Sequence, residues 1–187
     1  MSFTKERIRN LIFLLVIAIF LIPQTRLPIQ VFLHKGLALF SPSIEDTSER
    51  KQLTDYKWIL KSNSDAILEF QKLKGKVVFI NFWATWCPPC IAEMSSMQAL
   101  YEDYKGKIEF LFVSNEDKQV VTDFLLKKGY SFPVYKPLTY YPEGLEVDQI
   151  PRTLLINAKG DIIIDKTGAA NWNSDTVRET INKLLEY

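Results

Sequence analysis

Histidine and cysteine are scarce in this chain of 187 residues, which contains one histidine, His34, and two cysteines. A structural zinc site typically needs four cysteine or histidine ligands, and covalent haem attachment needs a histidine directly after a CxxC pair. Position 91 is an isoleucine. The formal net charge of +1 gives no basis for binding nucleic acid through bulk charge. We therefore expect no metal, no cofactor and no nucleic-acid partner.

At the N-terminus, basic residues precede an apolar run. Lys5, Arg7 and Arg9 come before residues 11–22, LIFLLVIAIFLI, which include no polar side chain. This order is typical of a segment that enters the membrane with its N-terminus in the cytoplasm. The run is short for a spanning helix, which needs about 17–25 residues, but the only small-x-small cleavage pattern lies well beyond it, at residues 36–38. We predict an uncleaved single-pass membrane anchor; a cleaved signal peptide is the alternative.

Two further segments separate the apolar run from the rest of the chain. Residues 27–40 are apolar with scattered basic side chains, and they either lie along the membrane surface or pack on the following domain. Residues 41–52 are polar and typical of a linker. We therefore predict an anchor and juxtamembrane segment in residues 1–45. Residues 46–187 are then a domain on the periplasmic or extracytoplasmic side of the cell membrane.

Strand and helix patterns alternate along this domain. Nearly continuous apolar, β-branched runs predict buried strands, and apolar residues spaced by three and four predict helices. The expected strands are 56–60, 76–83, 107–114, 131–135, 153–157 and 161–165, and the expected helices are 65–73, 88–105, 117–129 and 174–187. The strand at 131–135 contains a proline, which favours a sheet edge. This order predicts a mixed sheet with helices on both faces, closed by a hairpin and a helix that Ser174 caps.

Both cysteines lie in the stretch NFWATWCPPC, residues 81–90. Pro88 disfavours helical dihedral angles at Cys87 and is tolerated in a first helical turn, so we expect Cys87 to cap a helix and Cys90 to lie one turn inside. Unpaired N–H groups at a helix N-terminus favour a thiolate. A disulfide that closes so short a loop contributes little as a structural crosslink. The spacing therefore favours redox exchange.

Three stretches together resemble a known family: FWATWCPPC, the dipeptide Ile150-Pro151 and TLLINAKGDI. They are similar to membrane-anchored thioredoxin-like proteins of the TlpA/ResA type, over about residues 56–187. The resemblance implies an α/β thioredoxin-like fold, a mixed central sheet flanked by helices, with a helix–strand insertion that we place at residues 117–135. It also implies that Pro151 is a cis-proline facing the disulfide. The substrate-binding residues that it implies are Trp83, Trp86, Pro88, Pro89, Ile150 and Pro151.

The predicted function is that of a thiol-disulfide oxidoreductase, a protein disulfide reductase. Cys87 would attack a substrate disulfide, and Cys90 would then attack the mixed disulfide and release the reduced substrate. The partners would be exported proteins with disulfides and a thiol electron donor in the membrane or envelope. The alternatives are a non-catalytic binding module with an inert disulfide and a thioredoxin-fold peroxidase. A peroxidase of the Thr-x-x-Cys kind would need a threonine where Ala84 stands.

The proton acceptor for Cys90 is a separate question. Thioredoxins commonly have a buried acid six positions before the first cysteine, but this chain has Asn81 there, which cannot take up a proton. Glu93 lies three positions after Cys90 on the same helix face, where ResA-like proteins have a glutamate. We predict that Glu93 is the proton relay for Cys90. The alternative is a solvated glutamate that interacts with the helix dipole.

A second departure from the family pattern follows the cis-proline. Arg152 stands where a small residue is usual. Its charge would either favour a thiolate or select acidic substrates, or the side chain would point to solvent. We expect the solvent-facing arrangement.

Overall fold

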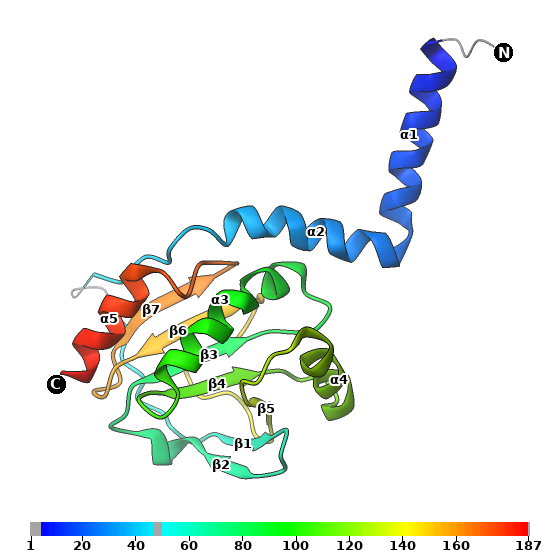
Figure 1. Cartoon of the computed structure of the whole chain (residues 1–187). Coiled ribbons are helices and arrows are strands. Elements are labelled where there is room, and N and C mark those ends of the chain that lie inside the picture. The colour runs from blue at the N-terminus through cyan, green and yellow to red at the C-terminus, as the bar shows by residue number, and fades with distance from the viewer. Residues whose placement is uncertain (1–4, 47–49, 187) are drawn as a thin grey trace.

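The computed structural model describes residues 5–46 and 50–186, and within them a seven-stranded mixed sheet forms the centre of the domain (Figure 1). The strand order is β2-β1-β5-β4-β3-β6-β7. Strands β3, β4 and β5 run parallel, and the other neighbours pair antiparallel. The strands are β1 Ile59–Ser62, β2 Ile67–Glu69, β3 Val78–Phe82, β4 Glu109–Val113, β5 Val134–Pro137, β6 Arg152–Ile156 and β7 Ile162–Thr167.

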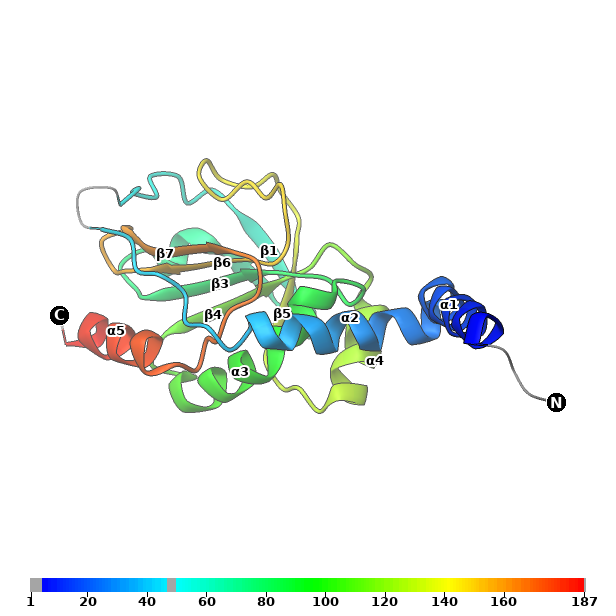
Figure 2. The same cartoon turned by 90° about the horizontal axis from the view of Figure 1, so that it is seen from above.

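Three α-helices pack on one face of this sheet: α3 Pro88–Tyr104, α4 Lys118–Lys128 and α5 Asp175–Leu185 (Figure 2). They share one apolar core with side chains of β3 and β4, such as Phe79 and Phe112. The opposite face is covered by the 3-10 helix η1 Phe70–Leu73 and by irregular segments. We expected helices on both faces of the sheet. On this second face the only helix among the described residues is the short 3-10 helix η1.

Central strand β3 shows why the sequence folds this way. All five of its residues are buried, because helices cover one face and the η1 layer covers the other. Strands covered on both faces have nearly continuous apolar sequences. The exception in β3 is Asn81, whose side chain reaches the site described below.

Two predicted elements were wrong. Residues 65–73 form strand β2 followed by η1, not a helix, because a turn at Asp65, with φ of 68°, folds the chain back so that β2 pairs with β1. Strand β5 is not an edge strand, since β1 pairs with its free side. A proline cannot donate an N–H to a neighbouring strand, but Pro133 precedes β5 and Pro137 is its last residue, so neither lies in the middle of the strand.

The other predicted strands and helices lie within about three residues of their expected positions, and the insertion consists of α4 and β5. Gly129 ends α4 in the left-handed region, with φ of 71°, where glycine has no steric penalty. Ser174 occupies the N-cap position of α5, but its side chain makes no capping hydrogen bond. The predicted position of the cap is therefore confirmed, but the expected hydrogen bond of the cap side chain is absent.

The N-terminal part forms two helices, α1 Lys5–Leu21 and α2 Pro23–Leu37. Helix α2 lies along α3, whereas α1 rises away from the domain (Figures 1 and 2). Over the described ranges, no helix combines the length and the apolar character that crossing a bilayer requires. Membrane anchoring therefore stays a prediction here.

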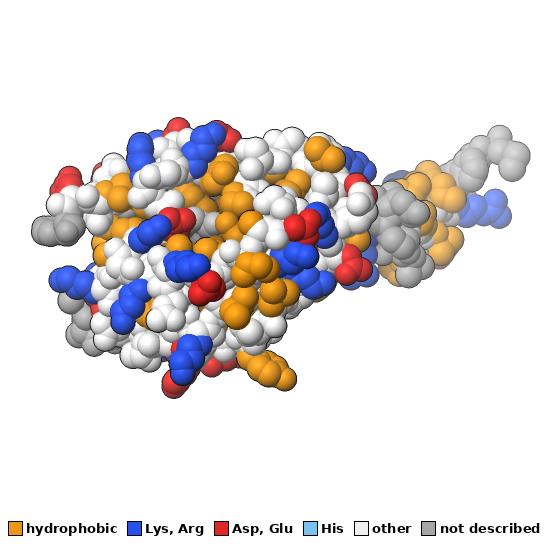
Figure 3. Space-filling model, turned by 90° about the horizontal axis from the view of Figure 1, so that it is seen from below, with side chains coloured by type: hydrophobic (Ala, Val, Ile, Leu, Met, Phe, Trp, Pro, Cys, Tyr) orange, Lys and Arg blue, Asp and Glu red, His pale blue; other side chains and the backbone are white. Residues whose placement is uncertain are grey.

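The predicted linker lies along the domain where it is described; residues 47–49 fall outside the described ranges. The Glu45 N–H donates to the Ile163 carbonyl oxygen at 2.9 Å, and Gln52 forms a bridge with Asp161. The division between residues 45 and 46 stays a prediction. On the side of the domain farthest from α2, basic, acidic and apolar side chains are interspersed (Figure 3).

Candidate active site

The two cysteines form a disulfide at the start of α3. Cys87 is the N-cap residue, with extended backbone angles, and two prolines begin the helix. The Cys90 backbone N–H donates to Cys87 Sγ at 3.3 Å. The predicted placement of both cysteines is confirmed. Cys87 is 3% exposed and Cys90 1%, so the oxidised pair is nearly covered.

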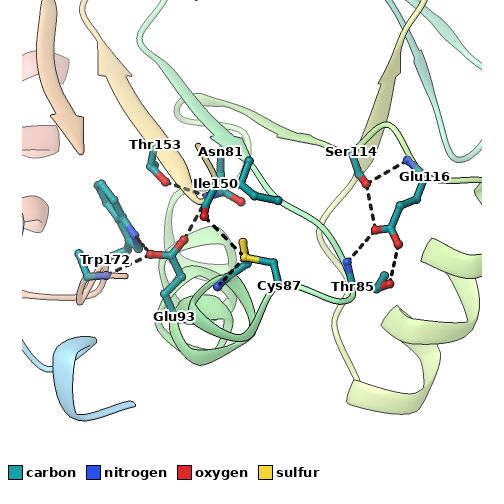
Figure 4. Close-up of a disulfide and its surroundings, with 11 residues drawn as sticks. Asn81, Thr85, Cys87, Glu93, Ser114, Glu116, Ile150, Thr153 and Trp172 are labelled. Carbon is teal, nitrogen blue, oxygen red and sulfur yellow. Dashed lines mark hydrogen bonds between the residues drawn. A yellow bond between two sulfur atoms is a disulfide. The ribbon is translucent and has the colours of Figure 1, made fainter. Parts of the chain in front are cut away.

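The loop before β6 faces this disulfide. The peptide bond between Ile150 and Pro151 is cis, as the resemblance implied. The Ile150 carbonyl oxygen lies 3.8 Å from Cys87 Sγ (Figure 4). A substrate strand that paired with this loop would therefore lie beside the reactive sulfur.

Glu93 is buried, with 1% of its surface exposed, so the alternative of a solvated glutamate is wrong. Its Oε2 accepts hydrogen bonds from Trp172 Nε1 at 2.9 Å and from the Ala170 N–H at 3.1 Å. Burial raises the pKa of Glu93 to about 8, although hydrogen bonds from Trp172, Ala170 and Asn81 act in the opposite direction. A carboxyl group with such a pKa can take up or release a proton near neutral pH.

Asn81 connects Glu93 to the sheet. Its Nδ2 donates to Glu93 Oε1 at 3.2 Å and to Thr153 Oγ1 at 2.8 Å (Figure 4). Its Oδ1 is buried and has no hydrogen-bond partner within the described part of the chain. The carboxyl group of Glu93 therefore lies next to the position where thioredoxins commonly have a buried acid.

The two predicted flanking tryptophans differ in accessibility. Trp83 is buried and packs against Phe124 and Phe132. Trp86 is 65% exposed. It borders a hollow of about 320 Å³ that Ile150 also lines, together with apolar residues such as Tyr141 and Val147. Trp83 lies at the wall of the same hollow but is only 2% exposed, so Trp86 offers nearly all of the accessible tryptophan surface.

The remaining predicted contact residues lie at the entrance to this site. Pro88 and Pro89 are half-buried in the first turn of α3. Ile150 is partly buried and packs against both apolar cores of the domain. The fold thus brings all predicted substrate-binding residues together, although Trp83 lies beneath the surface.

Arg152 does not point to solvent, so this expectation is wrong. Its Nε and Nη2 donate to the two carboxylate oxygens of Asp165 at 2.9 and 2.7 Å. It also donates to the carbonyl oxygens of Gly144 and Glu146. The guanidinium group therefore fastens the loop before the cis-proline to β7.

Sequence reasoning missed Glu116, which accepts hydrogen bonds from both the N–H and Oγ1 of Thr85, each at 2.6 Å. This carboxylate holds the loop that leads to Trp86 and Cys87. A signal was present: Glu116 and Thr85 each follow one of two neighbouring parallel strands, whose C-terminal ends meet at one sheet edge. Trp172, also missed, lies 79 positions from Glu93 and had no local signal.

A metal ion has no evident place here. Within residues 5–46 and 50–186, no group of three or more histidine, cysteine, aspartate or glutamate side chains is arranged to hold one.

Known protein sequences similar to this chain include redox proteins with a thiol-disulfide activity. Residues 51–184 match the model of the Redoxin family. Proteins named thiol-disulfide oxidoreductase ResA are 37% identical over 115 residues in Halalkalibacterium halodurans and 34% over 114 in Bacillus subtilis. Each alignment covers 59% of this chain, and the chain spans 65% and 64% of the two relatives, a little under two thirds. The resemblance to ResA-type proteins is confirmed.

Solved structures are similar to the fold. A putative thiol:disulfide interchange protein DsbE from Chlorobium tepidum has a TM-score of 0.57 at 21% identity, covering 76% of this chain and 99% of its own. A DsbF homologue from Corynebacterium diphtheriae has a TM-score of 0.58 at 19% identity, covering 78% and 92%. These likenesses show a thioredoxin-like fold. From its family match and its fold, the chain belongs to the Redoxin family.

Proposed function

We propose that this chain is a thiol-disulfide oxidoreductase that reduces disulfides of exported proteins through Cys87 and Cys90. One observation carries the proposal: the disulfide at the N-terminus of α3 faces the cis-proline loop, and the same helix carries a buried carboxyl group, Glu93, three positions after Cys90. The ResA relatives, which are named thiol-disulfide oxidoreductases, support the same chemistry.

The first step needs a nucleophilic sulfur. In the reduced protein, the Cys87 thiolate is stabilised by the Cys90 N–H and by the positive end of the α3 dipole. It attacks one sulfur of a substrate disulfide, so a bond between Cys87 and that sulfur forms while the substrate disulfide breaks. The leaving substrate thiolate takes up a proton from water.

The second step needs Cys90 to lose its proton. The Glu93 carboxylate, one turn further along α3, accepts it. The Cys90 thiolate then attacks Cys87 Sγ, the intramolecular disulfide forms, and the second substrate thiolate leaves. Two electrons have passed from the protein to the substrate, and a thiol donor of the membrane or envelope returns them by the same exchange.

The substrate contacts follow from the surface beside the sulfur. The Ile150 backbone is placed to pair with an extended substrate segment. Trp86 and the adjoining hollow of about 320 Å³ suit an apolar side chain next to the substrate cysteine. The site therefore favours a polypeptide disulfide over a small polar one.

We also propose that the N-terminal helix α1 tethers the domain to the membrane. Lys5, Arg7 and Arg9 precede the apolar run, and the described side chains of residues 11–17 are exposed on all sides of the helix. Carbonate extraction and protease accessibility of the full chain in cells test this. A chain that carbonate releases would contradict the tether, and a domain on the cytoplasmic side would contradict its proposed export.

The activity itself is tested by turnover. The full chain, supplied with a dithiol donor, should reduce a disulfide-bonded protein such as insulin, whereas Cys87→Ser and Cys90→Ser should not turn over. An inert disulfide would resist the donor and give no rate above the uncatalysed exchange. A peroxidase would instead consume peroxide with the same donor.

A further inference from the structure

Helix α2 packs one of its faces on the domain beside the active site. Leu27, Val31 and His34 are half-buried, and helix α2 lies along α3 (Figure 2). Leu27 and Val31 line a groove with Ile91 of α3, the residue that follows Cys90. Helix α2 is therefore part of the surroundings of the disulfide.

The opposite face of α2 is apolar as well. Phe32 lies at the outer rim of that groove, and with 3.6 residues per turn Leu33 points away from the face that contacts the domain. They are 75% and 63% exposed. A helix on a soluble domain normally has polar residues on this side. Here two basic residues, Arg26 and Lys35, flank the outward apolar face instead, as in helices that lie in a membrane interface.

Lysines without acidic partners surround the groove between α2 and the domain, which has a volume of about 690 Å³. Lys35 comes from α2, and Lys127 and Lys128 come from the end of α4. Within the described ranges, no ion pair or side-chain hydrogen bond involves these three lysines, although many other lysines of the domain are paired. The unpaired positive charge complements an anionic surface.

Helix α1 shows in which direction that surface lies. It continues from the N-terminal end of α2 and rises away from the domain, while α2 lies across the top of the domain (Figure 1). Its apolar side chains need an apolar environment, and none is offered by the domain. Across the domain from α2, basic, acidic and apolar side chains are interspersed, so the charges of that face are of both signs (Figure 3). The apolar and unpaired basic groups described above lie on the side of α1.

We propose that α2 lies flat in the interface of an anionic bilayer, with Phe32 and Leu33 among the lipid headgroups and Lys35, Lys127 and Lys128 facing the anionic lipids. The proposal rests on the membrane tether proposed above. It adds that the Cys87–Cys90 pair works directly beneath the membrane surface, because α2 separates α3 from the lipid by about one helix diameter of 10 Å. Substrate disulfides would then be those of membrane-bound or newly exported chains close to the bilayer.

The test uses the full chain with Cys87→Ser and Cys90→Ser as a cysteine-free background. A single cysteine is introduced at Leu33 or, as a control, at Tyr140, which is 96% exposed in a domain loop. Each is labelled with an environment-sensitive fluorophore and reconstituted in vesicles of phosphatidylcholine and phosphatidylglycerol. Lipids with a spin label at the headgroup should quench position 33 several-fold more than position 140.

The role of the lysines is tested in the same vesicles. Replacing Lys35, Lys127 and Lys128 by glutamine should weaken the quenching at position 33, as should vesicles of phosphatidylcholine alone. A matched control replaces three exposed lysines elsewhere by glutamine: Lys51, Lys57 and Lys159. An unchanged signal in the first triple variant would overturn the electrostatic part of the proposal.

The outcomes separate this proposal from the tether and from the activity. If the protein floats with the vesicles but the two positions are quenched equally, α2 does not lie in the interface and the tether survives. Emission that shifts to the blue at position 33 without quenching by lipid would mean that a second copy of the chain covers α2, which overturns the proposal. Failure to float overturns both membrane proposals, while insulin reduction by the parental chain still tests the activity.

Discussion

Asn81 Nδ2 donates a hydrogen bond to Glu93 Oε1 at 3.2 Å, and both side chains are buried. The acid beneath the central strand thus comes from α3 rather than from β3. Asn81 Oδ1 has no partner in the described structure. A half-turn of this amide would let Oδ1 accept the proton of a neutral Glu93, with Thr153 Oγ1 donating in turn. The pair can therefore accommodate both protonation states of the carboxyl group.

Glu93→Gln should slow the release of mixed disulfides more than their formation. Glutamine cannot accept the Cys90 proton, so Cys87 still attacks the substrate, but the attack of Cys90 on the mixed disulfide becomes slow. A general base typically raises the rate of such a step by a factor of about 10²–10⁴. Rapid acid quenching followed by mass spectrometry measures the mixed disulfide. Glu179→Gln, on the exposed side of α5, is the control. Turnover of Glu93→Gln at the parental rate across neutral pH would exclude Glu93 as the relay.

The stability of the oxidised protein should fall as pH rises. The pKa of Glu93 is raised in the fold to about 8 from 4.5. Between these values the folded state keeps a proton that the unfolded state has lost, so this stabilising contribution is complete below about pH 4.5 and gone above about pH 8, a difference of up to about 5 kcal/mol. Urea unfolding over this range measures it, and Glu93→Gln should remove most of the slope. Equal slopes in the two proteins would mean that Glu93 titrates normally.

Trp172→Phe should raise the pKa of Glu93 further. The change removes the Nε1–H that stabilises the carboxylate, while the ring contact with Phe79 at 5.3 Å can be kept. Carbon-13 NMR of the Glu93 carboxyl group measures the shift. Trp58→Phe is a matched control, because Trp58 is equally buried and its Nε1 has no partner among the described residues. A similar shift in both variants would indicate a general packing effect.

Arg152→Ala should destabilise the domain by about 1–3 kcal/mol, since it leaves Asp165 and two loop carbonyl oxygens without their donor. Arg152→Lys should recover only part of this, because an ammonium group cannot form the two parallel bonds. Urea unfolding gives the free energies, and hydrogen exchange should become faster at residues 142–147. Full recovery by lysine would show that charge alone matters.

The sequence was most informative where the chemistry is local. Pro88 marks the boundary between strand and helix, so the positions of Cys87 and Cys90 could be predicted from neighbouring residues. The helix predicted at 65–73 was wrong because apolar spacing in a short segment fits both a helix and an edge strand that turns back. Pairing with β1 decides between them, and β1 is itself held in the sheet by β5, which is remote in sequence.

The environment of Glu93 could not be predicted for a related reason. Its position on α3 was evident, but its burial depends on Trp172 and Ala170, which come from the segment after β7. The pairing of Arg152 with Asp165 likewise arises from the register of two antiparallel strands. Such contacts are set by tertiary packing, to which the local pattern gives no access.

Trapping of the mixed disulfide tests the central claim, that Cys87 is the attacking thiol of a redox-active pair. Reduced Cys90→Ser and Cys87→Ser variants are each mixed with a peptide that contains a disulfide, and the products are weighed by mass spectrometry. The account predicts that Cys90→Ser gains one peptide half on Cys87, with one equivalent of peptide thiol released, whereas Cys87→Ser stays largely unmodified. Equal modification of both variants, or of neither, would contradict it.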